Sequence, residues 1–170
     1  MKRLIGLILS AALALTVLAG CVLPKQNEQE GLRLWFLMDL TDWTLSAAAM
    51  ASFDYQGTET VPAVMAAMLA GPTADSDLIS PIPQGTVLQG WSLNNGILHI
   101  DLSRPYGDLV GVDLTLADYC LTLTLAQLEG VEGVYITVNG ADIPYRDRRI
   151  LYADDVLFSG AEEDPAGESS

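Results

Sequence analysis

The chain of 170 residues has few of the side chains that carry most protein chemistry, since it contains one histidine and two cysteines. Positive charge is also scarce: eight Lys and Arg stand against 22 Asp and Glu, for a formal net charge of -14. Phosphate backbones repel so acidic a surface, and the composition therefore excludes nucleic acid as a partner. Two cysteines cannot supply the disulfide framework of a small secreted domain.

The N-terminus has the pattern of a secretory signal peptide, which we place at residues 1–20. A Lys-Arg pair precedes an apolar run, which is shorter than the about 20 apolar residues that cross a bilayer. The motif Leu18-Ala19-Gly20-Cys21 resembles a bacterial lipobox, in which a diacylglyceryl group joins the cysteine sulfur and a peptidase cuts before it. The alternatives are an ordinary signal peptide, or an N-terminal anchor helix, with a chance cysteine.

Lipidation would place the protein on the extracytoplasmic side of the cell membrane. The mature chain would begin at Cys21 and be anchored there by fatty chains such as palmitate. Residues 21–31 are mostly polar and unpatterned, so we predict a flexible tether. Residues 159–170 are acidic and have no aromatic or branched apolar side chain, which predicts a disordered tail. The folded body is then residues 32–158.

The sequence of the first half of the folded body predicts two strands and a helix. Residues 32–40 fit a buried strand, and residues 39–44 a turn. Residues 45–55 are ambiguous, and we prefer a strand to a helix there. A helix is expected from Thr58 or Thr60 to Gly71, because a capping residue with a following proline begins helices and Gly-Pro ends them. The helical spacing of Met65 and Met68 predicts core residues and not a soft-metal site.

The strongest local signal is the Asn95-Gly96 turn between residues 86–93 and 97–102, which predicts a β-hairpin. Pairing across the turn gives the hairpin an apolar face towards the core and a polar face towards water. The expected apolar-face pairs are Leu93–Leu98, Trp91–Ile100 and Gln89–Leu102; the polar-face pairs are Ser92–His99 and Gly90–Asp101. No nucleophile is placed near His99 by spacing, so we do not expect it to be catalytic.

The second half continues with a loop at residues 104–111 and a helix at 113–128 that Asp113 can cap. Alternation of Leu and Thr at residues 121–125 leaves a strand as the competing interpretation. Residues 133–139 predict a strand, Asn139-Gly140 a turn, and residues 142–158 an extended or irregular closing segment. Cys120 lies among apolar residues and is expected in the core.

The only basic cluster of the sequence lies in the closing segment and consists of Arg146, Arg148 and Arg149. We interpret it as a solvated strand edge that discourages aggregation, with contact to an acidic partner as the alternative.

Four short motifs give the body a family resemblance through their order. They are LAGPT at Leu69–Thr73, IPQGT at Ile82–Thr86, IDLS at Ile100–Ser103, and the segment Val131–Gly140. Together they resemble a GerMN domain, the module named from a sporulation and spore-germination lipoprotein of the bacterial envelope. The resemblance implies an α+β fold similar to ring-building motifs, with a mixed sheet of four to five strands and two helices on one face. The chain departs from that lipoprotein by having one copy of the module instead of two, and by a poor match at residues 42–51.

The resemblance implies a role in protein interaction or assembly and no defined reaction. The partners would be the membrane, through Cys21, and an unidentified envelope protein or a second copy of the chain. The sequence has no metal-ligand spacing and no Gly-rich phosphate loop, so we predict no catalytic residue, no metal and no cofactor. Asp154-Asp155 and Glu162-Glu163-Asp164 are interpreted as solvated charge, with weak calcium binding as the alternative.

A second hypothesis is an anchored enzyme or ligand-binding protein that acts on cell-wall material. Such a protein should have a concave site with two converging carboxylates, or with His99. An interaction module should instead have an apolar patch or an unpaired strand edge.

Overall fold

The computed structural model describes residues 31–38, 50–144, 146 and 148–156. The chain divides into two units, Met1–Glu30 and Gly31–Ser170, and every described residue belongs to the second. The predicted signal peptide, Cys21, the tether up to residue 30, residues 39–49 and the acidic tail lie outside the described residues. In the part of the chain that is described, no helix is long and apolar enough to cross a bilayer.

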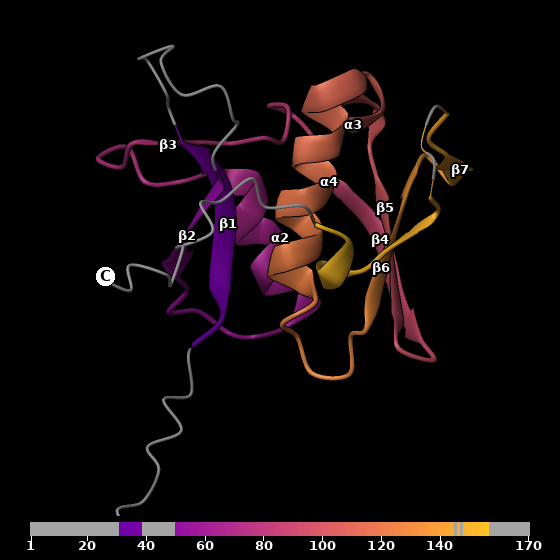
Figure 1. The fold of residues 1–170 in the computed structure, drawn as a ribbon, viewed down its shortest axis with the longest axis horizontal. Helices are drawn as coiled ribbons and strands as arrows, with labels where there is room; N and C mark the ends of the chain where they lie inside the picture. Colours follow the sequence, from indigo (N-terminus) through magenta and orange to yellow (C-terminus); the bar gives the residue numbers. More distant parts are fainter. Residues whose placement is uncertain (1–30, 39–49, 145, 147, 157–170) are drawn as a thin grey trace, which may run out of the picture. The chain divides into compact units, whose positions relative to one another are not determined.

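Two β-sheets build the domain (Figure 1). The smaller sheet is antiparallel, with the order β2-β1-β3, and consists of β1 (Arg33–Met38), β2 (Met50–Asp54) and β3 (Leu78–Ile79). The larger has the order β4-β5-β6-β7, with β8 also paired to β6; its strands are β4 (Leu88–Asn94), β5 (Ile97–Leu102), β6 (Gly133–Val138), β7 (Ala141–Asp142) and β8 (Ile150–Leu151). The predicted α+β class is confirmed. The expected single sheet is wrong, because β1 pairs with β2 and β3 and not with the hairpin.

Three α-helices are described: α2 (Val61–Ala70), α3 (Arg104–Gly107) and α4 (Gly111–Leu125), together with the short 3-10 helix η1 (Ala153–Asp155). Helix α2 has proline in its first turn and ends before Gly71, as predicted. Gly71 has a positive φ of 81°, but its ψ of 177° differs from that of the predicted left-handed helical cap. Helix α3 lies where the sequence predicted only a loop. Helix α4 begins before the expected Asp113 cap, with Val110 in the N-cap position.

Helix α4 runs between the two sheets, with β1 on one side and β6 on the other (Figure 1). Every residue from Cys120 to Leu125 is buried. A helix that is covered on all sides has no polar face, so its sequence shows no helical period. This explains the alternation of Leu and Thr at residues 121–125. The helix predicted there is confirmed, and the competing strand interpretation is wrong.

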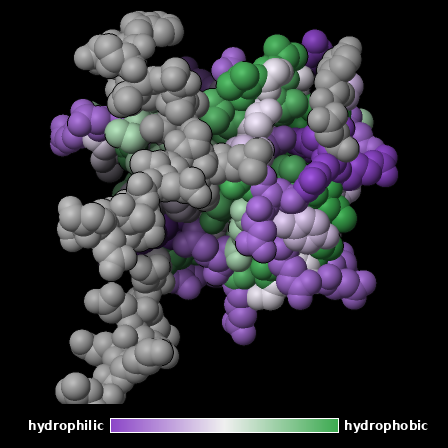
Figure 2. All heavy atoms as spheres, viewed as in Figure 1, coloured by the Kyte–Doolittle hydropathy of each residue, from purple (hydrophilic) through white to green (hydrophobic). Residues whose placement is uncertain are grey.

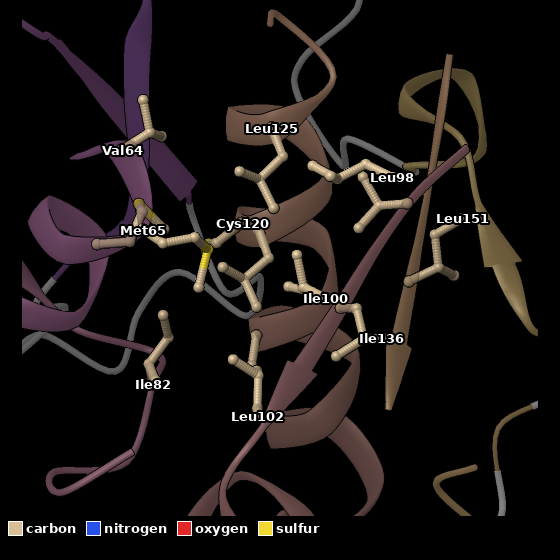
Figure 3. Close-up of a cluster of buried hydrophobic side chains, with 14 of the residues drawn as sticks. Val64, Met65, Ile82, Leu98, Ile100, Leu102, Cys120, Leu125, Ile136 and Leu151 are labelled. Carbon is tan, nitrogen blue, oxygen red and sulfur yellow. The ribbon is translucent and has the colours of Figure 1, made fainter. Parts of the chain in front are cut away.

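The hydrophobic core lies around α4 (Figure 3). Leu125 faces Leu98 of β5, and the sulfur of Cys120 lies on the side of Met65 of α2. Cys120, Met65 and Met68 are fully buried, which confirms their prediction as core residues. Burial raises the pKa of the Cys120 thiol to about 12, because the apolar surroundings disfavour the thiolate.

Polar side chains of α4 and of the turn after it close the part of the β1 edge that β3 does not cover. The Arg33 N–H donates to Gln127 Oε1 at 2.9 Å, and Gln127 Nε2 donates to the Arg33 carbonyl at 2.8 Å. The Trp35 N–H donates to the Thr124 hydroxyl at 3.0 Å. Strand β3 pairs only with the last two residues of β1. An amide and a hydroxyl thus bind backbone groups that an open sheet edge would leave for another chain.

Replacing Thr124 with valine should lower the free energy of unfolding by about 1–3 kcal/mol, because it removes the acceptor of the Trp35 N–H bond. Thr122→Val is a matched control, since both threonines are fully buried on the same helix but the Thr122 hydroxyl has no hydrogen-bond partner among the described residues. The Thr122→Val substitution should leave the free energy of unfolding unchanged or raise it. Urea unfolding followed by tryptophan fluorescence measures both. Equal losses in the two variants would contradict the closing of the β1 edge by α4.

Candidate functional site

Strand β4 forms an edge of the five-stranded sheet, and among the described strands it pairs with β5 alone. Asn95 and Gly96 have φ values of 50° and 79°, as a two-residue type I′ turn requires. The pair that closes such a turn is hydrogen-bonded, and hydrogen-bonded pairs alternate along an antiparallel ladder. The backbone N–H and C=O groups of Trp91 and Leu93 therefore point away from β5. Within the described residues, no hydrogen bond reaches them.

The side chains of Trp91 and Leu93 are also exposed. They oppose Ile100 and Leu98, which are fully buried, yet remain 49% and 38% exposed because they lie at the rim of the core. Val87, just before the strand, is 56% exposed, and β4 contains no charged residue. Both backbone groups of Val87 are bonded to Ser103, so we define the β4 edge as the exposed side chains of Val87, Trp91 and Leu93 together with the unpaired backbone groups of Trp91 and Leu93. An open, uncharged edge with exposed apolar side chains is a surface on which another strand can pair.

The hairpin is confirmed in part. The predicted pairs that the structure contains are Leu93–Leu98, Trp91–Ile100, Ser92–His99 and Gly90–Asp101. The pair Gln89–Leu102 is wrong: Leu88 opposes Leu102, because a β-bulge between Leu88 and Gly90 inserts Gln89 as an extra residue. The expected burial of the apolar face holds for β5 but not for β4. Sequence reasoning assigned Trp91 and Leu93 to the core and so missed the β4 edge.

His99 belongs to a hydrogen-bonded chain that links β5 to β6. Its Nε2 lies 2.8 Å from Thr137 Oγ1, which donates to Asp101 Oδ1 at 2.7 Å. The same carboxylate oxygen accepts the Gly140 N–H at 2.8 Å, and the His99 ring stacks on Tyr135 with centroids 4.8 Å apart. Hydrogen bonds through Thr137 therefore link His99 to Asp101, and they connect β5 to β6.

A cavity of about 690 Å³ lies between the first half of α4 and residues 146–155. Asp118 and Arg146 form a buried ion pair at its wall, in which the guanidinium Nη2 and Nε donate to the two carboxylate oxygens at 2.6 and 2.9 Å. Arg146 Nη1 donates to the Ile136 carbonyl, and the Tyr106 hydroxyl donates to Asp118 at 2.8 Å. Burial raises the pKa of Asp118, and the charge of Arg146 opposes this shift.

The arginines of the predicted basic cluster have different environments. The interpretation as a solvated edge is wrong for Arg146, which is buried against Asp118. Arg148 pairs with Asp155 and Arg149 with Asp142 at more exposed positions. The chain itself thus supplies the acidic partner of each arginine. Sequence reasoning missed the Arg146 pair because its carboxylate lies 28 residues upstream on another element.

The cavity meets only part of the criterion for an enzyme. Carboxylates line it, but Asp118 and Asp155 are each engaged by an arginine, and His99 is not among the lining residues. A general acid or base must be free to exchange a proton, whereas Asp118 accepts three hydrogen bonds.

Hydrophobic residues gather at the end of α4 near α3 (Figure 2), where Val112, another lining residue, is 69% exposed. Among the described residues, no three His, Cys, Asp or Glu side chains could hold a metal ion.

Comparison with known protein families identifies the class of protein to which this fold and motif order belong. The Germane family, described as "Sporulation and spore germination", matches residues 40–144. The match covers more than half of the chain, which therefore belongs to this family, as the motif order predicted.

Two solved structures are similar to the chain. The first GerMN domain of the sporulation protein GerM from Bacillus subtilis gives a TM-score of 0.56 at 17% identity, covering 72% of this chain and 97% of that one. The tandem GerMN domains of the same protein give 0.55 at 15% identity, covering 71% of this chain and 43% of that one. At these identities the likeness shows the fold alone. A comparison with curated proteins found no match.

Replacing Arg146 with alanine should lower the free energy of unfolding by about 3–5 kcal/mol, because Asp118 then stays buried without its cation. The double variant Asp118→Ala with Arg146→Ala should lose less than the sum of the two single losses. Arg148→Ala, at the exposed pair with Asp155, should lose only a small fraction of the Arg146→Ala effect. Chemical unfolding of the four variants measures these changes; additive losses would show that the buried pair is not coupled.

Proposed function

We propose that this chain is a lipid-anchored protein of the bacterial envelope, whose GerMN domain docks another envelope protein in sporulation or spore germination. The lipobox-like Leu18-Ala19-Gly20-Cys21 supports the anchor, which places the domain on the extracytoplasmic side of the cell membrane. Membership of the Germane family supports the link to sporulation and germination. The observation that carries the docking role is the β4 edge, which combines unpaired backbone groups with exposed apolar side chains.

A comparison of two strand edges within the molecule supports this role. Soluble proteins blunt their open edges with charges, prolines or covering elements, because an open edge pairs with other chains. The edge of β1 is covered by β3, Thr124 and Gln127. Within the described residues, the regular part of β4 beyond its bulge contains no charge and no proline, and no second strand pairs with it. We infer that β4 stays open because a partner strand binds there.

A second candidate is an anchored enzyme or ligand-binding protein that acts on cell-wall material. The observation in its favour is the cavity of about 690 Å³ with Asp154 and Asp155 in its wall. This volume falls within the roughly 300–1,000 Å³ range of small-molecule sites. The docking function is preferred because two of the cavity's carboxylates are already neutralised by arginines.

Crosslinking in intact cells tests the proposed function. A photoreactive p-benzoyl-phenylalanine replaces Trp91 in the β4 edge, and in a control it replaces Asp75, an exposed residue of the loop before β3. We expect an adduct of defined mass from position 91 and none from position 75. In a Cys21→Ser background the chain should leave the membrane fraction and the adduct should be lost, because the domain is no longer held beside its partner.

Equal labelling from both positions would contradict docking at β4. An undiminished adduct from a Cys21→Ser chain that stays in the membrane fraction would contradict the lipid anchor. No adduct from position 91, together with hydrolysis of wall fragments by the purified chain, would support the second candidate instead.

A further inference from the structure

Two exposed glutamates lie in the loop between α4 and β6, near the hairpin turn at the end of β4. The loop that carries Glu129 and Glu132 is tied to the hairpin turn by the Glu132 N–H, which donates to the Gly96 carbonyl at 2.7 Å. A Cβ added at Gly96 would lie 2.8 Å from the Glu132 carboxylate, and one added at Gly130 would lie 3.7 Å from Leu93 Cδ2. Both glutamates are exposed. The Glu132 carboxylate therefore lies at the hairpin turn that ends β4, and Gly130, between the two glutamates, lies beside the Leu93 side chain.

No cation of the described residues balances these glutamates. The described chain contains no lysine, and each of its arginines forms an ion pair with an aspartate. These pairs are Arg33–Asp54, Arg104–Asp108, Arg146–Asp118, Arg148–Asp155 and Arg149–Asp142. The negative charge beside the β4 edge is thus left for a partner to neutralise.

We infer that the β4 edge binds an extended segment of a partner protein that has apolar side chains at alternate positions and a lysine or arginine beside them. This inference rests on the proposed function and specifies the segment that the docking surface accepts. The segment would add a strand to the sheet through hydrogen bonds with the backbone of Trp91 and Leu93. Alternate side chains of a strand share one face, so its apolar residues would pack on Trp91 and Leu93. Its basic residue would then reach Glu129 or Glu132.

A second copy of this chain fits the edge less well. Strand β4 has no basic residue, so pairing of two β4 strands would leave the glutamates of both copies unbalanced. The chain also carries a formal net charge of -14, and two copies therefore repel each other.

Two peptide probes test the inference on the full chain purified in detergent. One is acetyl-Lys-Val-Thr-Val-Thr-Val-Lys-amide, and the other has glutamate in place of both lysines. Lysine at both ends makes the test independent of strand direction. The fluorescence anisotropy of dye-labelled peptides measures their binding. The lysine peptide should bind about ten-fold more tightly than the glutamate peptide, and its affinity should fall as salt screens the charges.

Matched double variants locate the charge effect. Glu129→Gln with Glu132→Gln should weaken lysine-peptide binding by about ten-fold, because it removes the carboxylates that the lysine faces. Asp75→Asn with Asp77→Asn makes the same change in net charge in the loop before β3 and should leave binding unchanged. Trp91→Ala with Leu93→Ala should abolish binding of the lysine peptide, because it removes the apolar contacts.

Equal affinity for the two peptides, or equal losses in the two charge variants, would overturn the inference. So would a dimer in light scattering that Trp91→Ala dissociates, because it would assign the edge to a second copy. If the peptides bind equally, or the charge variants lose equally, while position 91 still crosslinks a different protein in cells, the proposed docking function stands and only the partner's chemistry is wrong. Lysine-selective peptide binding without any crosslink would support this inference and contradict the cellular docking role.

Discussion

The burial of the second half of α4, where every residue from Cys120 to Leu125 is covered, is the constraint on which the rest of the structure depends. Buried polar side chains of a helix that packs between two sheets need partners inside the protein. Thr124, with Gln127 just beyond the helix, finds partners in the backbone of β1, and Asp118 finds them in Arg146 and Tyr106. These contacts hold the three-stranded sheet and the closing segment to the same helix. The polar groups of α4 therefore join parts of the chain that are distant in sequence.

The same arrangement leaves the two sheets with different edges. Strand β1 lies beside α4, and the side chains of Thr124 and Gln127 bind its backbone groups. Strand β4 lies at the outer side of β5, and within the described residues the outer backbone groups of Trp91 and Leu93 are unpaired. Because β4 lies at this edge, the side chains of Trp91 and Leu93 are exposed to solvent. This difference between a closed edge and an uncharged, open one is what supports the proposed docking role. The carboxylates near the open edge then favour a basic partner.

Local signals in the sequence predicted most of the elements. The Asn95-Gly96 turn predicted the hairpin, and proline and glycine predicted the ends of α2, because these residues restrict the backbone wherever they occur. Features that depend on tertiary contacts could not be predicted. They are the separate three-stranded sheet, the bulge at Gln89, and the pairing of Arg146 with Asp118. The β4 edge was missed for a similar reason, since the pattern of Trp91 and Leu93 indicates a face but not whether a helix covers it. The anchor at Cys21 lies outside the described residues and stays a prediction.

Native-state hydrogen exchange of single amides tests the contrast between the two edges most directly. The amides of Arg33 and Trp35 donate to side chains of the α4 region and should exchange slowly, through global unfolding. In the partner-free protein, the amides of Trp91 and Leu93 should exchange close to the rate of an unstructured chain, because nothing in the described chain accepts them. Slow exchange of Trp91 and Leu93, equal to that of Trp35, would show that the β4 edge is closed and would contradict the account.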